Sequence, residues 1–188
     1  MKQFFFLLGI LLGTGLFAQR TERTEQFTAD LDRMGLAVIE PLDENFRARG
    51  NFDNPTQNFH YRVQSKYDDV EYRFYLIPYD DHRPQTQMPH VETGRIMMNV
   101  ATNEGDEEEM IVQRNLDADE LQATGAEWGA EFYLRPKRTF TERYEFCRLV
   151  SLYREGRGTV LMFVLFNDPG NRELDRSYDW LRFHDNPN

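Results

Sequence analysis

Apolar residues recur along this chain with two spacings, one typical of helices and the other typical of strands. Phe27, Leu31 and Met34 lie four and three residues apart, which predicts a short helix that ends near Gly35. The apolar residues that follow predict a short strand, which Pro41 ends. The first two elements of the folded chain are therefore expected to be a helix and a strand.

The strongest strand signal is a hairpin in residues 59–79, "FHYRVQSKYDDVEYRFYLIPY". Two runs rich in aromatic and β-branched residues flank a predicted turn at residues 67–69. Successive side chains of a strand point to opposite faces, so the second run is expected to have one buried face and one wetter face. The buried face consists of Tyr72, Phe74 and Leu76, and the wetter face consists of Glu71, Arg73 and Tyr75.

Three stretches predict loops by their glycine, proline and polar content. They are residues 47–58, residues 80–94 and the acidic residues 102–109, "TNEGDEEE". Between the last two, residues 95–101, "RIMMNVA", predict another strand, and residues 110–114 predict a short one. The acidic stretch is expected to be a solvated hairpin tip, because a calcium loop would alternate its ligands with a turn glycine.

Asp117 and Glu120 carry the best local helix signal of the chain. Each side chain can accept a hydrogen bond from the backbone N–H of the other residue, which is a capping box, and Leu116 adds an apolar contact ahead of it. The box predicts a helix that Pro136 ends. The apolar face of this helix is expected to consist of Leu121, Trp128 and Phe132.

The last part of the chain predicts a hairpin and a helix. Residues 160–166, "VLMFVLF", are apolar at every position, which a strand tolerates only where both faces of its sheet are covered. The run that contains Cys147 predicts the neighbouring strand, with "REGRG" as the turn. Residues 171–185 predict a terminal amphipathic helix, with apolar positions at Leu174, Tyr178 and Leu181.

Taken together, these elements run helix, four or five strands, helix, two strands, helix. The strands come mostly in hairpins, so the sheet should be largely antiparallel, and helices are needed to cover its two apolar faces. We expect an α+β fold, an α/β/α sandwich whose helices cover both faces of a central, mostly antiparallel sheet.

Residues 1–18 have the layout of a secretory signal peptide, with Lys2 before an apolar run and Ala18 as the residue before cleavage. The alternative is a retained N-terminal anchor, for which Arg20 and Arg23 would act as the stop. With cleavage, residues 19–188 form a single domain without a transmembrane segment. That domain is expected to be exported, either to the periplasm or as a secreted protein.

A resemblance supports the same fold. The stretches "GAEWGAEF" and "LYREGRGTVLMFVLF", with the closing aromatic segment, resemble a group of exported proteins of unknown function. The element order is similar to the PsbP-like α/β/α fold, and the "LFAQ" end of the leader is similar to leaders common in Bacteroidota. The likeness covers roughly the C-terminal half, and it implies a fold used by accessory and binding proteins.

The formal charge of −10 argues against nucleic acid as a partner, because an acidic chain repels phosphate backbones. The single cysteine, Cys147, excludes an intramolecular disulfide. A nucleophilic thiol is the sharper interpretation of Cys147, but free cysteine is among the most buried residue types. We therefore expect Cys147 to be an inert core residue.

The loop at residues 80–94 contains the candidate metal ligands. Imidazole and carboxylate groups can bind zinc or another transition metal, although their spacing here matches no standard motif. A solvated polar loop is the alternative interpretation. The candidates are Asp80, Asp81, His82, His90 and Glu92.

No catalytic motif was found, and no cofactor is expected. The sequence favours an exported, non-catalytic binding or accessory domain that acts on a protein, a cell-envelope component or a small ligand. The alternative is a small metal-assisted or carboxylate hydrolase that uses the loop at residues 80–94. A third class, an envelope assembly factor, would require a contiguous exposed apolar patch.

Overall fold

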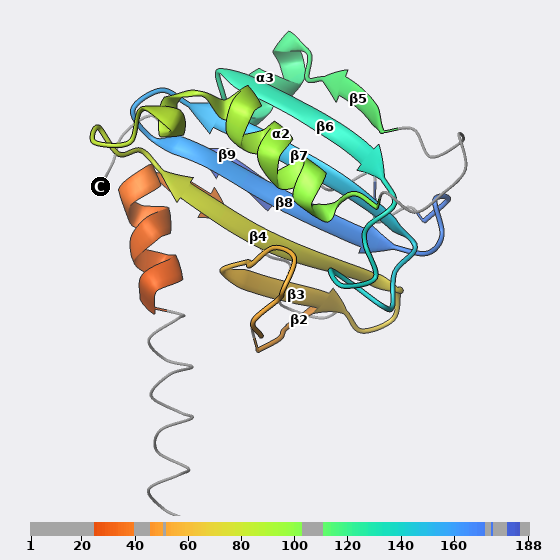
Figure 1. The fold of residues 1–188 in the computed structure, drawn as a ribbon. Coiled ribbons are helices and arrows are strands. Elements are labelled where there is room, and N and C mark those ends of the chain that lie inside the picture. Colours follow the sequence, from red (N-terminus) through yellow and green to blue (C-terminus); the bar gives the residue numbers. More distant parts are fainter. Residues whose placement is uncertain are drawn as a thin grey trace, which may run out of the picture.

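The fold is built on a seven-stranded antiparallel sheet (Figure 1), seen in a computed structural model. The structure describes residues 25–39, 46–50, 52–102, 111–171, 174 and 180–184. The strand order is β2 (Phe46–Ala48), β3 (Tyr61–Ser65), β4 (Val70–Pro78), β8 (Gly158–Phe166), β7 (Phe146–Arg154), β6 (Trp128–Leu134) and β5 (Val112–Asn115). A second, two-stranded sheet pairs β1 (Leu36–Val38) with β9 (Leu181–Phe183). The helical segments are residues 25–34, η1 (Pro84–Gln87), α2 (Pro89–Val100) and α3 (Ala118–Thr124).

Strand β8 lies at the centre of the large sheet, between β4 and β7, and all nine of its residues are buried. Its side chains alternate between two core clusters, one containing Val160, Met162 and Val164 and the other containing Leu161, Phe163 and Leu165. The prediction that "VLMFVLF" is a strand covered on both faces is confirmed. A strand without a polar position has to be placed in this way, because either face would otherwise expose apolar surface to water.

The β7–β8 turn depends on glycine. Gly156 and Gly158 have positive φ angles of 68° and 115°, a backbone region that side chains with a Cβ rarely adopt. A Cβ on Gly158 would also lie 2.2 Å from the backbone oxygen of Ile77 on β4. The predicted "REGRG" turn is therefore confirmed, and Gly158 additionally allows β4 and β8 to approach each other at the end of the sheet.

The two core clusters lie on the two faces of the sheet. One combines Ile96 and Val100 of α2 with residues of β6, β7 and β8. The other contains Phe27 and Met34 of the first helix, together with Leu36, Leu181 and Phe183 of the small sheet. The architecture is therefore mixed α/β with a large antiparallel sheet, as an α+β fold requires.

Residues 95–101 do not form the predicted strand, because they lie mainly in helix α2. The helix begins at Pro89. Proline is favourable there because the N–H groups of the first helical turn have no acceptor within the helix, so the missing N–H of proline costs no hydrogen bond. The buried positions are three or four residues apart, so the stripe crosses the boundary that the prediction placed at Gly94. They are Pro89, Thr93, Ile96 and Val100. Pro89, a residue type that also indicates loops, therefore marks the start of a helix here.

The capping box at Asp117 is confirmed, but the helix is much shorter than predicted. The Glu120 N–H donates to Asp117 Oδ1 at 2.9 Å, and the Asp117 N–H donates to Glu120 Oε2 at 2.8 Å. The helix ends at Thr124 because Gly125 adopts the left-handed conformation that closes helices. Trp128 and Phe132 lie in strand β6, which corrects their placement on the helix face.

Other predictions have mixed outcomes. The first helix, the strand after it and the β3–β4 hairpin are confirmed, whereas residues 46–48 form strand β2 at the start of a predicted loop. Leu181 lies in strand β9 and not in a terminal helix. The rest of that predicted helix lies mostly outside the described residues, as do the leader and residues 103–110. Within the described ranges, no helix has the length and apolar character needed to cross a membrane.

Candidate functional site

The predicted metal ligands of the β4–α2 connection do not converge on a point where a metal ion could sit. Asp80 accepts a hydrogen bond from Arg83 Nε at 2.7 Å, and this bond is the main reason why the pKa of Asp80 is lowered. His82 points into solvent with 90% of its side chain exposed, and its Nε2 lies 3.6 Å from Asp81. Asp80 is therefore paired with an arginine, while His82 faces water, and the three side chains do not surround one position.

His90 and Glu92 lie in the first turn of α2, so they belong to a helix that the sequence did not predict. His90 is exposed, and Glu92 accepts a hydrogen bond from Arg95 at 2.8 Å. In the part of the chain that the structure describes, His, Cys, Asp and Glu side chains form no group of three or more that could hold a metal ion.

Cys147 lies in β7 and is 1% exposed. Burial raises the pKa of its thiol to about 12, and the charge of Arg73 acts in the opposite direction. A thiol of this kind stays protonated near neutral pH and is a poor nucleophile. The expectation that Cys147 is a core residue is confirmed.

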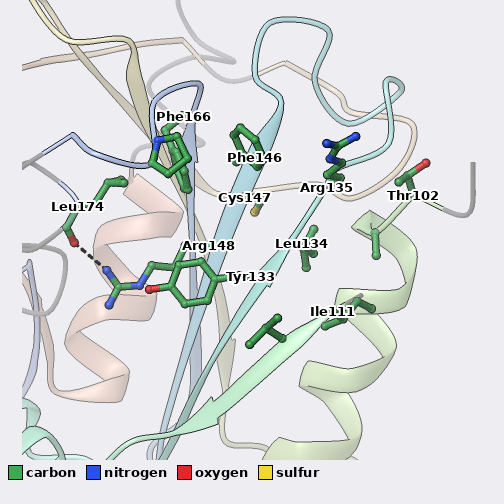
Figure 2. A pocket seen from close by; sticks show the side chains of 13 residues that line it. Thr102, Ile111, Tyr133, Leu134, Arg135, Phe146, Cys147, Arg148, Phe166 and Leu174 are labelled. Atoms are coloured by element: carbon green, nitrogen blue, oxygen red, sulfur yellow. Dashed lines mark hydrogen bonds between the residues drawn. The ribbon is translucent and has the colours of Figure 1, made fainter. Parts of the chain in front are cut away.

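An apolar pocket of about 340 Å³ lies beside Cys147 at the ends of β5, β6 and β7. Figure 2 shows Leu134, Phe146 and Ile111 around it, together with the buried side chain of Arg148. Arg148 donates to the backbone oxygen of Leu174 at 2.7 Å and forms an ion pair with Glu131 on β6. The guanidinium group of Arg148 is therefore used by the fold itself.

A larger cavity, of about 700 Å³, lies over strands β3 and β4. Two connections form its rim, with Arg49 and residues 52–55 after β2 and residues 138–144 between β6 and β7. They lie on the same side of the sheet as α2, which covers β7 and β8 and leaves this end to the loops (Figure 1). We call this concavity the arginine cavity, from the five arginines that line it: Arg49, Arg62, Arg73, Arg138 and Arg143.

The floor of the arginine cavity is a buried ion pair. Arg73 donates from Nε to Glu71 Oε1 at 2.7 Å and from Nη1 to the Phe140 backbone oxygen at 2.8 Å. The rings of Phe52, Phe59 and Phe140 surround its guanidinium group at 4.7–5.4 Å. The face predicted to be wetter is thus buried at these two positions, because each charge has a partner.

Arg62 is the second arginine that lies close to the Glu71 carboxylate. Its Nη1 lies 3.7 Å from Glu71 Oε2, and its Nη2 donates to Gly50 O at 2.9 Å. Among the described residues, Arg62 Nε is the one buried side-chain polar atom without a hydrogen-bond partner. Burial and the charges of Arg73 and Arg49 lower the pKa of Arg62, while Glu71 raises it. Two guanidinium groups therefore share one carboxylate.

A chain of hydrogen bonds runs along the same wall. Arg49 Nε donates to Gln64 Oε1 at 2.9 Å, and Gln64 Nε2 donates to the Tyr144 hydroxyl at 3.2 Å. Tyr144 is buried, which raises its pKa, so it keeps its proton as a donor. The Tyr144 hydroxyl, the outer nitrogens of Arg49 and the second amide hydrogen of Gln64 supply further donors in this chain.

Contacts between the two rim loops hold the cavity in shape. Asn54 Nδ2 donates to the Phe140 backbone oxygen at 2.9 Å, and the Asn54 side-chain oxygen accepts the N–H groups of Thr56 and Gln57. The Thr56 hydroxyl bonds to the Thr139 hydroxyl at 2.6 Å. The rim is therefore organised by polar side chains that are far apart in the sequence.

Charge is uneven in this concavity. Five arginines line it against three carboxylates, Asp53, Glu71 and Glu142, in a chain of net charge −10. Arg143 is paired with Asp69, whereas no ion pair with a described residue is formed by Arg49 or Arg138. An arrangement of fixed cations and neutral donors can hold an anionic group.

The sequence did not predict this site, although one signal was present. Arg62 and Gln64 on one strand and Glu71 and Arg73 on the next are polar at every second position, on the face of the sheet that also carries α2. The loop residues that close the cavity carry no comparable pattern. No model of a known protein family and no curated protein matches this chain, so its geometry is the basis for assigning a function.

Proposed function

We propose that this protein is an exported, non-catalytic binding domain and that its arginine cavity binds a small ligand through an anionic group. The observation that carries the proposal is the unpartnered Nε of Arg62, buried in a cavity with more arginines than carboxylates. The leader at residues 1–18 supports export. We also propose that the fold is an α/β/α sandwich of PsbP-like type.

An unpaired buried donor favours an acceptor ligand. Leaving a buried polar group unsatisfied costs about 1–3 kcal/mol, and more for a charged group, so a ligand oxygen that accepts from Arg62 Nε removes this cost. The Tyr144 hydroxyl and the outer nitrogens of Arg49 add donors on the same wall. Carboxylates and phosphates are the groups whose oxygen atoms match several N–H and O–H donors at once.

The chemistry of these side chains supports binding over catalysis. Guanidinium groups stay charged at all ordinary pH values, so they hold an anion and do not exchange protons with it. Glu71, the carboxylate of the floor, is engaged by Arg73 and lies close to Arg62. This carboxylate is therefore held by the arginines of the floor and serves the fold.

The experiment is titration calorimetry of the purified chain with inorganic phosphate and with acetate, at constant ionic strength. We expect saturable binding that weakens with added salt. Arg49→Gln and Arg62→Gln should each weaken binding about tenfold, the effect of one charge-assisted hydrogen bond. Arg182→Gln is the matched control, because Arg182 is exposed on β9 and lines neither cavity.

Two results would contradict the proposal. The first is that the folded chain shows saturable binding of neither phosphate nor acetate. The second is equal weakening by the Arg62→Gln and Arg182→Gln variants, which would show a general effect of surface charge.

A further inference from the structure

A second, smaller pocket adjoins the arginine cavity. Its volume is about 210 Å³, and it lies between the first helix and the loop before β3. The two concavities share Phe52 and Asp53 in their walls, so they are separated by the width of one loop segment. We call the smaller one the aromatic pocket, because its walls include Phe27, Phe52, Phe59 and His60.

Phe52 faces both concavities. The guanidinium carbon of Arg62 lies 5.0 Å from the centre of its ring, and that of Arg73 lies 5.4 Å away. Phe59 meets the same ring edge-to-face, with 5.2 Å between the centroids. At 42% exposure, Phe52 is an aromatic side chain that the core leaves open at the boundary between a charged site and an apolar one.

The other walls of the aromatic pocket are held in place. Phe27 stacks on Tyr61 with 4.8 Å between ring centroids, and His60 stacks on Tyr75 at the same distance. The backbone N–H of Leu76 donates to His60 Nδ1 at 3.0 Å. Burial lowers the pKa of His60, which favours the neutral ring over the imidazolium ion. These side chains present a rigid aromatic surface.

From this juxtaposition we infer that the site binds oxyanions that carry a planar ring. The anionic group occupies the arginine cavity, and the ring enters the aromatic pocket against Phe52 and Phe27. The inference rests on the proposed function, because it adds a second subsite to the same ligand. Its physical basis is that aromatic rings prefer offset or edge-to-face packing on other rings, beyond the area they bury.

The test compares pairs of probes that differ by one ring, by titration calorimetry on the full chain. The pairs are phenyl phosphate with inorganic phosphate, and benzoate with acetate. We expect the ring to tighten binding about tenfold in both pairs, the effect of one aromatic contact. The two pairs also show whether a phosphate or a carboxylate is preferred.

Two variants locate the ring. Phe52→Ala should remove the preference for the ring-bearing probe, and Phe27→Leu should reduce that preference. Phe52 contacts Arg62, whereas Phe27 belongs to a different wall of the aromatic pocket. Phe27→Leu keeps an apolar side chain in the core, so it serves if Phe52→Ala disturbs the loop. The control is Tyr67→Ala, which removes a ring that is 79% exposed in the β3–β4 turn.

The outcomes separate the inference from the proposed function. Equal affinity for probes with and without a ring overturns the inference and leaves anion binding intact. A ring preference that survives both variants also overturns it, because the ring would then lie elsewhere. If none of the four probes binds, the proposed function fails and the inference fails with it.

Discussion

Arg148 on β7 and Glu131 on β6 form an ion pair inside the protein, with 2.6 Å between Nη2 and Oε2. The two side chains are 7% and 4% exposed. Glu131 also accepts from Arg114 Nε at 2.6 Å, and Arg114 donates to both oxygens of Glu120 at 2.7 Å. Because Glu120 closes the capping box of α3, this network connects the sheet to the start of a helix.

The first prediction concerns this pair. Glu131→Gln removes the charge that faces two guanidinium groups, and the loss of one partner of a buried pair costs about 3–5 kcal/mol. We expect a fall of that size in the free energy of unfolding, measured by urea denaturation with circular dichroism. Glu92→Gln is the control, because its partner Arg95 is 55% exposed and such a pair contributes at most about 1 kcal/mol. Similar losses in the two variants would contradict the role of Glu131.

The second prediction concerns the start of α3. Asp117→Ala removes the side chain that accepts the Glu120 N–H, and the loss of such a cap costs about 1 kcal/mol. The same denaturation experiment measures it. Asp119→Ala changes a carboxylate in the same helical turn that makes no cap, and should cost a few tenths of a kcal/mol. An unchanged midpoint for Asp117→Ala would place the helix start elsewhere.

The third prediction concerns the thiol. Cys147 is buried and its pKa is raised to about 12, so maleimide should modify the native protein only at the rate at which the chain opens. In denaturing urea, labelling should be complete within minutes. Mass spectrometry after timed quenching measures both rates. Rapid labelling of the folded chain would contradict the burial of this residue.

The fourth prediction concerns pH. Burial lowers the pKa of His60 below its usual 6.5, while the charge of Asp30 opposes the shift. As the pH falls below 6.5, the unfolded chain takes up the proton first, so the stability that depends on neutral His60 is lost between 6.5 and the folded-state pKa. It is fully present above pH 6.5.

The measurement is urea denaturation between pH 7.5 and pH 5, with the wild type compared with His60→Gln. The difference in unfolding free energy between the two should shrink as the pH falls, because only the wild type loses the His60 contribution. His82→Gln is the control, because it removes an imidazole that lies in solvent, with 90% of its side chain exposed. A constant difference between the wild type and His60→Gln would contradict the assignment.

Local patterns were enough to identify several elements of this fold. The stripe of Phe27, Leu31 and Met34, the β3–β4 hairpin and the glycine turn before β8 each depend on residues close in sequence. The unbroken apolar run of β8 also placed it inside the sheet, because such a run needs cover on both faces. The position of Cys147 followed from its strand pattern in the same way.

Two elements were misassigned because one signal has two meanings. Pro89 begins α2, although proline usually indicates a loop, and Gly125 ends α3 where the apolar spacing predicted a longer helix. Trp128 and Phe132 are four residues apart, which suits a helix face as well as two same-side positions of a strand. Pairing of β6 with β5 and β7 resolves that ambiguity, and such pairing is a long-range property.

The arginine cavity was beyond any local pattern. Arg73 donates to the backbone of Phe140, 67 residues away, and Asn54 reaches the same oxygen from a third part of the chain. Side-chain type and strand alternation place Arg62, Gln64, Glu71 and Arg73 on one face of β3 and β4. Whether that face is solvated or enclosed depends on the two loops that cross it, and their path is set by contacts between residues distant in sequence.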